Sequence, residues 1–382
     1  MTYAEGRTYL DADSHLMELP NWLEEFADRG TREKLRPLYL GGAGALAEQA
    51  ILDAQRRAED PEAASALERE LMTQKGWNAL GAFDPGERSR ALDLLGFEGQ
   101  LVFSTFAPTQ FLGDDLELLY AGTTAHNRGM AAFCADDPRL LAVANVPWAD
   151  PERTLRAAEE AISFGCAAVH VPSHPGAGLS PTHPDYDPLW ALLQDADVPF
   201  MLHVGGGGRL LRRAFHENGR PVSDFLGGGE NIRAKDYMAI HQPPEQFLSA
   251  LVLDGILDKF PRLRGGCIEQ GAMWVVPWLR RLDIGQGSFA RTEPTLRDLP
   301  ERASDYVHRQ LWFTPFPTEP VGWMTEEAGD DLFLFSSDFP HPEGGRDPLG
   351  RFEASLAGAT ERQRERFYSG NFTDMMGAAA AR

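Results

Sequence analysis

The chain has 382 residues, of which 43% are hydrophobic and 24% charged, and its formal net charge is −21. This composition is typical of a globular protein with a buried core, and one large α/β barrel with insertions explains the length as well as two domains do. The strong negative charge opposes contact with a phosphate backbone, so a nucleic-acid partner is not expected.

The cysteines and the start of the chain bear on where the protein works. Cys134, Cys166 and Cys267 are odd in number and widely spaced, which predicts neither a disulfide framework nor a CxxC metal site. The N-terminal residues contain no apolar signal segment, and no run of about 18 apolar residues occurs. We therefore expect a cytoplasmic protein without a membrane partner.

Short apolar runs rich in β-branched and aromatic residues alternate with helical patterns along the whole chain. Strands are predicted at 8–13, 100–104, 140–146, 167–171, 199–204, 263–269, 310–314 and 332–337, with helices such as 151–164, 186–196 and 244–260 between them. Eight such units predict an α/β fold of the (β/α)8 TIM-barrel type, with residues 1–382 forming one domain.

Two connections are longer than a barrel loop needs to be. Residues 32–99 contain a charge-mixed helical pattern and are predicted to form a helical insertion or lid after the first strand. Residues 205–243 are rich in glycine and arginine and follow the fifth strand. Loops of this length in a compact domain are usually functional or mobile.

Metal-ligand residue types collect at the predicted strand ends, where barrel enzymes place their active sites. Asp13 and His15 are two residues apart on the first strand, so both side chains point to the same face. His203 ends the fifth strand and Asp338 follows the eighth. Each residue alone is explained as a turn or core residue, but the four together predict a site for a divalent ion.

The mixture of nitrogen and oxygen ligands suits zinc, with manganese or iron as alternatives. One ion per chain is expected, because no lysine lies on a predicted strand to bridge a second one. Asp11 and Glu18 flank the first two ligands and are interpreted either as groups that orient these ligands or as turn and helix-cap residues.

Four residues are candidates for catalysis. Glu269 ends the sixth strand among apolar residues and glycine, and it is either a general acid or base or a carboxylate that orients a ligating histidine. Asp338 is a further candidate in addition to its predicted role as a ligand. His170 on the fourth strand and His241 in the loop after the fifth are acid–base candidates.

Two residues are candidates for substrate binding. Arg209 follows four glycines in a run that matches no nucleotide-binding motif, and it is available to pair with a substrate carboxylate. Arginine is expected in this role because the chain contains only four lysines. His341, three residues after Asp338, either reaches the substrate or caps the following loop.

Five segments together resemble a known family. They are LDADSH, DYDPLWALLQDADVPFMLHVG, LDKFPRLRGGCIEQGAMWVVPWLRRLD, LFSSDFPHP and YSGNFTDMMG. The chain resembles the amidohydrolase-related superfamily, in particular its branch of aminocarboxymuconate-semialdehyde decarboxylase-like proteins. The resemblance implies that Asp13, His15 and His203 are ligands of one ion, that Asp338 is the eighth-strand carboxylate, and that the protein forms a homodimer.

One position departs from this branch, because Glu269 stands where its decarboxylases usually have a catalytic histidine. The resemblance predicts an enzyme that acts on a small carboxylated cyclic or aromatic catabolite, by non-oxidative decarboxylation. A metal-dependent hydrolase that activates water is the first alternative, and a barrel that binds a ligand without chemistry is the second.

Overall fold

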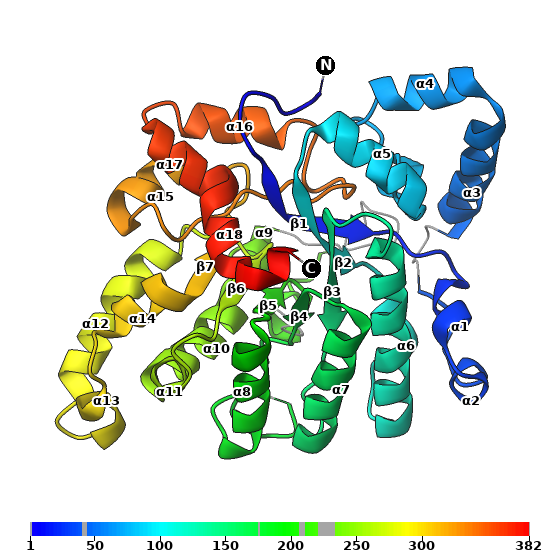
Figure 1. Cartoon of the computed structure of the whole chain (residues 1–382). Coiled ribbons are helices and arrows are strands. Elements are labelled where there is room, and N and C mark those ends of the chain that lie inside the picture. Colours follow the sequence, from blue (N-terminus) through cyan, green and yellow to red (C-terminus); the bar gives the residue numbers. More distant parts are fainter. Residues whose placement is uncertain (1, 40–43, 175, 206–210, 221–233, 382) are drawn as a thin grey trace.

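Seven parallel strands form one curled sheet at the centre of the molecule (Figure 1). The structure is a computed structural model that describes residues 2–39, 44–174, 176–205, 211–220 and 234–381. Each strand is hydrogen-bonded to the next one along the chain. They are β1 (Leu10–Leu16), β2 (Gly99–Ser104), β3 (Leu140–Asn145), β4 (Ala168–His170), β5 (Phe200–His203), β6 (Gly265–Ile268) and β7 (Leu311–Phe313).

The segment 332–339 lies between the two edge strands of this sheet. Leu334 donates its backbone N–H to Phe313 on β7 at 2.9 Å, and Ala12 on β1 donates to Phe335 at 3.0 Å. The segment thus connects β7 to β1, in agreement with a TIM-barrel-like fold. The regular strand predicted at 332–337 is not present, because Phe335 donates its N–H to Phe367 instead of a neighbouring strand, which interrupts the ladder.

Helices that follow the strands cover the outside of the sheet (Figure 1). Asp150 accepts the N–H of Arg153, Pro151 opens the helix, and Gly165 closes it with a φ of 96°. The helix predicted at 151–164 is therefore confirmed. These helices are α6 (Leu116–Cys134), α7 (Pro151–Phe164), α8 (Asp187–Ala196), α10 (Gln242–Leu253), α12 (Val275–Phe289) and α14 (Ala303–Gln310).

The prediction of one continuous helix at 244–260 is wrong. The structure has two helices there, α10 and α11 (Ile256–Lys259), because Gly255 adopts a φ of 78° between them. Glycine takes this left-handed conformation without steric cost, so the chain can turn at that point.

Further helices lie between β1 and β2 and near the C-terminus. Helices α3 and α4 form one corner of the molecule, at the upper right of Figure 1. Whether residues 32–99 act as an inserted lid stays a prediction. The first group is α1 (Trp22–Phe26), α2 (Arg29–Arg32), α3 (Gly44–Glu59), α4 (Pro61–Arg69) and α5 (Pro85–Leu95). The others are α9 (Ala234–Tyr237), α13 (Pro294–Asp298), α15 (Val321–Ala328), α16 (Pro348–Ser355), α17 (Glu361–Glu365) and α18 (Asn371–Met376).

The C-terminal helix α18 closes one end of the sheet interior. Phe372 and Met375 are buried in a cluster with strand residues such as Leu101 and Ile268. Arg264, which precedes β6, donates to the backbone oxygen of Met375 at 2.8 Å, so this helix lies at the amino ends of the strands. Polar side chains lie at the opposite end of the sheet interior, at the carboxyl ends of the strands.

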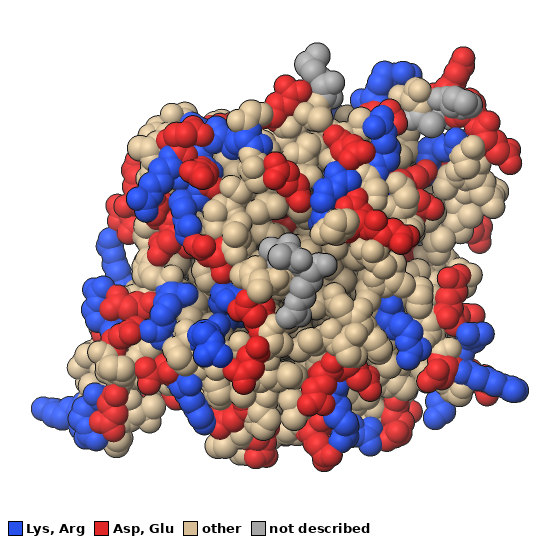
Figure 2. Space-filling model, viewed as in Figure 1, with Lys and Arg blue, Asp and Glu red and all other residues tan. Residues whose placement is uncertain are grey.

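The surface carries charges of both signs. On the face shown in Figure 2, lysine and arginine side chains lie among aspartate and glutamate side chains. None of the helices in the described ranges has the length and apolarity needed to cross a bilayer.

Candidate active site

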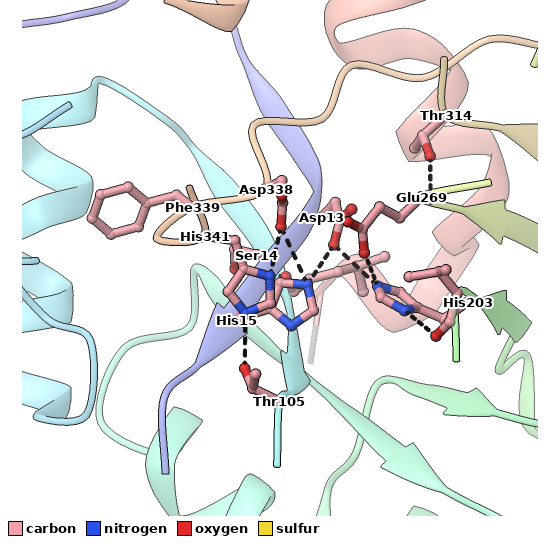
Figure 3. A network of polar contacts seen from close by, with 12 residues as sticks. Asp13, Ser14, His15, Thr105, His203, Glu269, Thr314, Asp338, Phe339 and His341 are labelled. Carbon is pink, nitrogen blue, oxygen red and sulfur yellow. Dashed lines mark hydrogen bonds and ion pairs between the residues drawn. The ribbon is translucent and has the colours of Figure 1, made fainter. Parts of the chain in front are cut away.

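Four polar side chains converge at the carboxyl ends of β1, β5 and β6 (Figure 3). His15 Nε2 lies 3.2 Å from Asp13 Oδ1, and the same oxygen lies 3.4 Å from His203 Nε2. His203 Nε2 is also 3.5 Å from Glu269 Oε2. Each of these residues offers a ligand atom within 4.8 Å of the others, so they form one potential metal-binding group, which we call the ligand cluster.

Asp338 lies on the other side of His15. Its Oδ1 atom is 3.4 Å from His15 Nε2 and 3.0 Å from His341 Nδ1. His15, Asp338 and His341 form a second group of potential ligands that shares His15 with the ligand cluster. The side chains that the sequence singles out at three strand ends therefore meet around His15.

The donor atoms of this region fit a divalent cation. Both ring nitrogens of His15 and Oδ1 of Asp338 are buried and have no hydrogen-bond partner within the described residues. His203 Nδ1 donates to the backbone oxygen of Val204 at 3.1 Å, and this bond turns Nε2 toward Asp13 and Glu269. Buried polar atoms without partners are costly, and a bound cation would supply the missing partner for His15 and Asp338.

Burial sets the protonation of the two β1 residues. Burial and the nearby His341 lower the pKa of His15 to about 4, although Asp13 opposes the shift. Burial alone would raise the pKa of Asp13, but its contacts with His15 and His203 outweigh this effect and hold the pKa below its usual value. At neutral pH the pair is thus a neutral imidazole beside a carboxylate, which is the form that binds metals.

Two acidic residues of the site, Glu269 directly after β6 and Asp338 three residues before His341, have unusual backbone conformations. Glu269 has a φ of 54° and Asp338 a φ of 51°, in the left-handed region that residues other than glycine rarely adopt. Glu269 is held by its N–H bond to Thr314 Oγ1 at 2.8 Å, and Asp338 by its N–H bond to the oxygen of Asp13 at 2.9 Å. Strain of this kind is concentrated at functional sites.

Asp11 supports the segment that carries Asp338. Its carboxylate accepts the N–H of Ser337 at 2.8 Å, the hydroxyl of Ser337 at 2.6 Å and the amide of Gln100 at 2.8 Å. Burial raises the pKa of Asp11 to about 7, against the effect of these hydrogen bonds. Of the two interpretations of Asp11, the structure favours the one in which it orients the ligands.

A buried arginine reaches the same region from α5. Arg88 is fully buried and donates to the backbone oxygens of Gly81, at 2.7 Å, and His15. Sequence reasoning missed this residue, because its role depends on contact with backbone atoms and not on a recognisable side-chain spacing.

The remaining predicted residues have different surroundings. His170 ends β4 with its ring centre 6.2 Å from that of His203, and burial lowers its pKa to about 3. His241 lies at the start of α10, 3.7 Å from Glu245, and no contact within the described residues joins it to the ligand cluster. Arg209 lies outside the described residues.

A small cavity opens beside the ligand cluster, and acidic residues make up much of its wall. A lysine adds positive charge nearby: Lys75 Nζ is buried without a hydrogen-bond partner in the described ranges, 5.8 Å from the ring centre of Phe339. Burial lowers its pKa, and the charge of Asp338 acts in the opposite direction. The residues that line the cavity include Asp13, Glu269, Thr314, Phe316, Asp338 and Glu343.

Comparison with known proteins agrees with this picture. Residues 11–375 match the family model described as Amidohydrolase. Gamma-resorcylate decarboxylase from a Rhizobium species is 25% identical to the chain over 265 residues, which is 66% of this chain and 76% of that protein.

Solved structures share the fold over nearly the whole chain. An amidohydrolase from Mycobacterium avium subsp. paratuberculosis superposes with a TM-score of 0.73 at 21% identity, covering 98% of this chain and 100% of that one. The 5-carboxyvanillate decarboxylase of Novosphingobium aromaticivorans, complexed with manganese and 4-hydroxy-3-methoxy-5-nitrobenzoic acid, gives a TM-score of 0.61 at 18% identity and covers 97% and 96%. As its motifs predict, the chain belongs to the amidohydrolase family.

Proposed function

We propose that this protein is a metal-dependent carboxy-lyase that decarboxylates a small aromatic acid without an oxidant. The observation that carries the proposal is the ligand cluster, where two histidines and two carboxylates meet at the carboxyl ends of the strands. The matched relative from Rhizobium, named for gamma-resorcylate decarboxylation, supports a carboxylated aromatic as the substrate class.

Asp13, His15 and His203 of the ligand cluster, together with Asp338 on the other side of His15, are the residues that would hold one divalent ion. Their nitrogen and oxygen atoms suit zinc, which the sequence predicts, and also manganese, which the Novosphingobium structure contains. When bound, the ion would supply positive charge to substrate oxygens in a site whose own side chains are mostly acidic. This charge is needed because an acidic cavity repels a carboxylate.

Decarboxylation breaks the bond between the ring carbon and the carboxyl carbon, releases carbon dioxide and places a proton on the ring carbon. Glu269 is the proposed proton donor, because its carboxyl group lines the cavity beside the cluster. Asp338 also lines this cavity and is the second candidate for this proton transfer. His170, Arg209 and His241 stay proposals for substrate contact or proton transfer.

Hydrolysis is the alternative that the same site permits. Glu269 replaces the histidine of related decarboxylases, and a carboxylate is well suited to accept a proton from an attacking water. The third possibility is a barrel that binds a ligand without chemistry.

The finer structural predictions belong to this proposal. A complete (β/α)8 barrel of one domain, a lid formed by residues 32–99, a homodimer and a cytoplasmic location are all compatible with it. Size determination in solution would test the homodimer directly.

A substrate panel in water labelled with oxygen-18 separates the reactions. Hydroxybenzoates and related cyclic acids are compared with their esters and lactones, and carbon dioxide release and label uptake are followed together. Decarboxylation releases carbon dioxide and leaves no new label in a carboxylate. Label in a carboxylate product without carbon dioxide release would indicate hydrolysis. The absence of both carbon dioxide and label would favour ligand binding without chemistry.

A further inference from the structure

Thr105, the residue directly after β2, has one hydroxyl group that contacts His341 (Figure 3), the backbone oxygen of Leu16 and, at 3.7 Å, the sulfur of Met17. Thr105 Oγ1 lies 2.8 Å from the backbone oxygen of Leu16 and 3.0 Å from His341 Nε2. A carbonyl oxygen can only accept and the hydroxyl has one hydrogen, so Thr105 donates to Leu16 and accepts the Nε2–H of His341. This contact decides which ring nitrogen of His341 faces Asp338.

The ring of His341 touches two of the proposed metal ligands. Its Nδ1 atom is 3.0 Å from Asp338 Oδ1. Its ring is stacked on that of His15, with ring centres 3.8 Å apart and an angle of 21° between the planes. A rotation of the His341 ring would therefore disturb both His15 and Asp338.

Thr105 is itself held by the buried carboxyl group of Glu18. Glu18 accepts the N–H of Thr105 at 3.0 Å with one oxygen and the N–H of Phe106 at 2.9 Å with the other. Glu18 is fully buried, and its backbone oxygen accepts the indole N–H of Trp77 at 3.2 Å. These bonds to Glu18 fix the backbone of Thr105 and thereby the position of its hydroxyl group.

We propose that Thr105 is a positioning residue for the metal centre, which acts through His341 on Asp338 and His15. The inference rests on the metal site of the proposed function, but it does not depend on which reaction the enzyme performs. Without the hydroxyl, the imidazole of His341 would lose the bond that fixes its orientation. Residues that orient metal ligands in this way typically contribute about 10–100-fold to metal affinity or activity.

The test compares Thr105→Val, which keeps the shape and removes the hydroxyl, with Thr105→Ser, which keeps the hydroxyl. Zinc affinity is measured by competition with a chelator, and the visible absorption spectrum is recorded for the cobalt-substituted protein. We expect Thr105→Val to weaken zinc binding by about 10–100-fold and to change the cobalt spectrum. Thr105→Ser should restore both to within about threefold of the natural protein.

A second variant keeps the test decisive if Thr105→Val does not fold. His341→Asn retains a polar atom near Asp338 but is too short to reach Thr105, so it should show the same loss of zinc affinity. Where both single variants fold, the double variant should bind zinc no more weakly than either, because the two residues act in one chain of contacts.

Three outcomes would overturn the proposal. Unchanged zinc affinity and spectrum in Thr105→Val would show that the hydroxyl positions nothing, and an equal loss in Thr105→Ser would assign the effect to packing. Complete loss of metal in His341→Asn with full retention in Thr105→Val would make His341 a ligand. All readouts are taken without substrate, so they stand even if the decarboxylase proposal fails.

Discussion

The ligand cluster and the helical region formed by α3, α4 and α5 both contain charged residues, but the two regions differ in how the polar atoms of these residues are hydrogen-bonded. In the helical region Arg57 binds both oxygens of Glu87 at 3.0 Å, and Arg90 binds Glu68 at 2.8 and 3.1 Å. At the cluster, the ring nitrogens of His15 have no such bonds within the described residues.

This difference in hydrogen bonding indicates which of the two regions binds a ligand. A larger cavity lies between α3, α4 and α5, and there Arg57 is paired with Glu87 and Arg90 with Glu68. Paired charges stabilise a fold, whereas the buried atoms of His15 and Asp338 without hydrogen-bond partners within the described residues lie among converging potential ligands, where a cation would stabilise them. The chemistry of the lining residues therefore identifies the site, and the size of a cavity does not.

The largest expected effect comes from removing a proposed ligand. His203→Ala should lower the metal content of the purified protein from about one divalent ion per chain to about a tenth of that or less. Turnover should fall by about 100-fold or more, because the imidazole is replaced by a methyl group. Elemental analysis and turnover measured on the same sample check both effects.

Two results would contradict this assignment. A natural protein with two ions per chain would show that the second group of potential ligands binds its own ion. Full metal content and activity in His203→Ala would exclude His203 as a ligand.

The next effect concerns Glu269 and changes turnover without changing metal. Glu269→Gln has the same shape but cannot transfer a proton, so turnover should fall by about 100-fold or more while metal content and fold are retained. Circular dichroism and elemental analysis are the controls. If metal is lost and turnover of the remaining metal-loaded fraction is normal, Glu269 is a ligand or orients one.

Much of this site could be predicted from sequence because of a topological rule. Asp13, His15 and His203 meet in space since the carboxyl ends of parallel strands face the same rim, and strand ends are visible in the apolar pattern. The same reasoning located β1 to β7 to within a few residues. It failed for 332–337, where a bond to Phe367 breaks the ladder.

Other parts of the site could not be predicted in this way. Thr105 and Arg88 act through contacts with backbone and ring atoms, and no spacing of residue types reveals such contacts. Lys75 was overlooked for another reason: the scarcity of lysine suggested arginine as the cation, whereas the structure buries this lysine beside Phe339. The motif around Asp338 identified His341, but its stacking on His15 appears only in three dimensions.

A smaller effect is expected on the pH dependence of stability, which depends on the buried residue Glu18. Burial raises the pKa of Glu18 from 4.5 to about 7. Between these values the unfolded chain ionises Glu18 while the folded protein keeps it protonated, so this residue makes stability fall as pH rises, by roughly 3 kcal/mol in total. Below about pH 4.5 and above about pH 7 its contribution is constant.

Glu18→Gln should remove this slope, because the amide does not titrate. Urea unfolding of both proteins, with the same metal present, gives the stability difference at each pH from 4 to 8. The difference should shift in favour of Glu18→Gln by a few kcal/mol between about pH 4.5 and 7. A difference that stays constant with pH would show that Glu18 has an ordinary pKa in the folded protein.

The smallest effect is expected in the helical region and completes the comparison. Arg90 and Glu68 form an ion pair on the surface, with the Arg90 side chain half exposed, and water and salt weaken such pairs. Arg90→Gln should therefore leave metal content unchanged, keep turnover within about twofold and shift the midpoint of thermal unfolding by no more than about 2 °C. A large loss of turnover without unfolding would mean that the cavity between α3, α4 and α5 communicates with the metal centre. The contrast between surface ion pairs and the buried atoms of His15 and Asp338 that have no hydrogen-bond partner within the described residues would then no longer separate structural from functional regions of this protein.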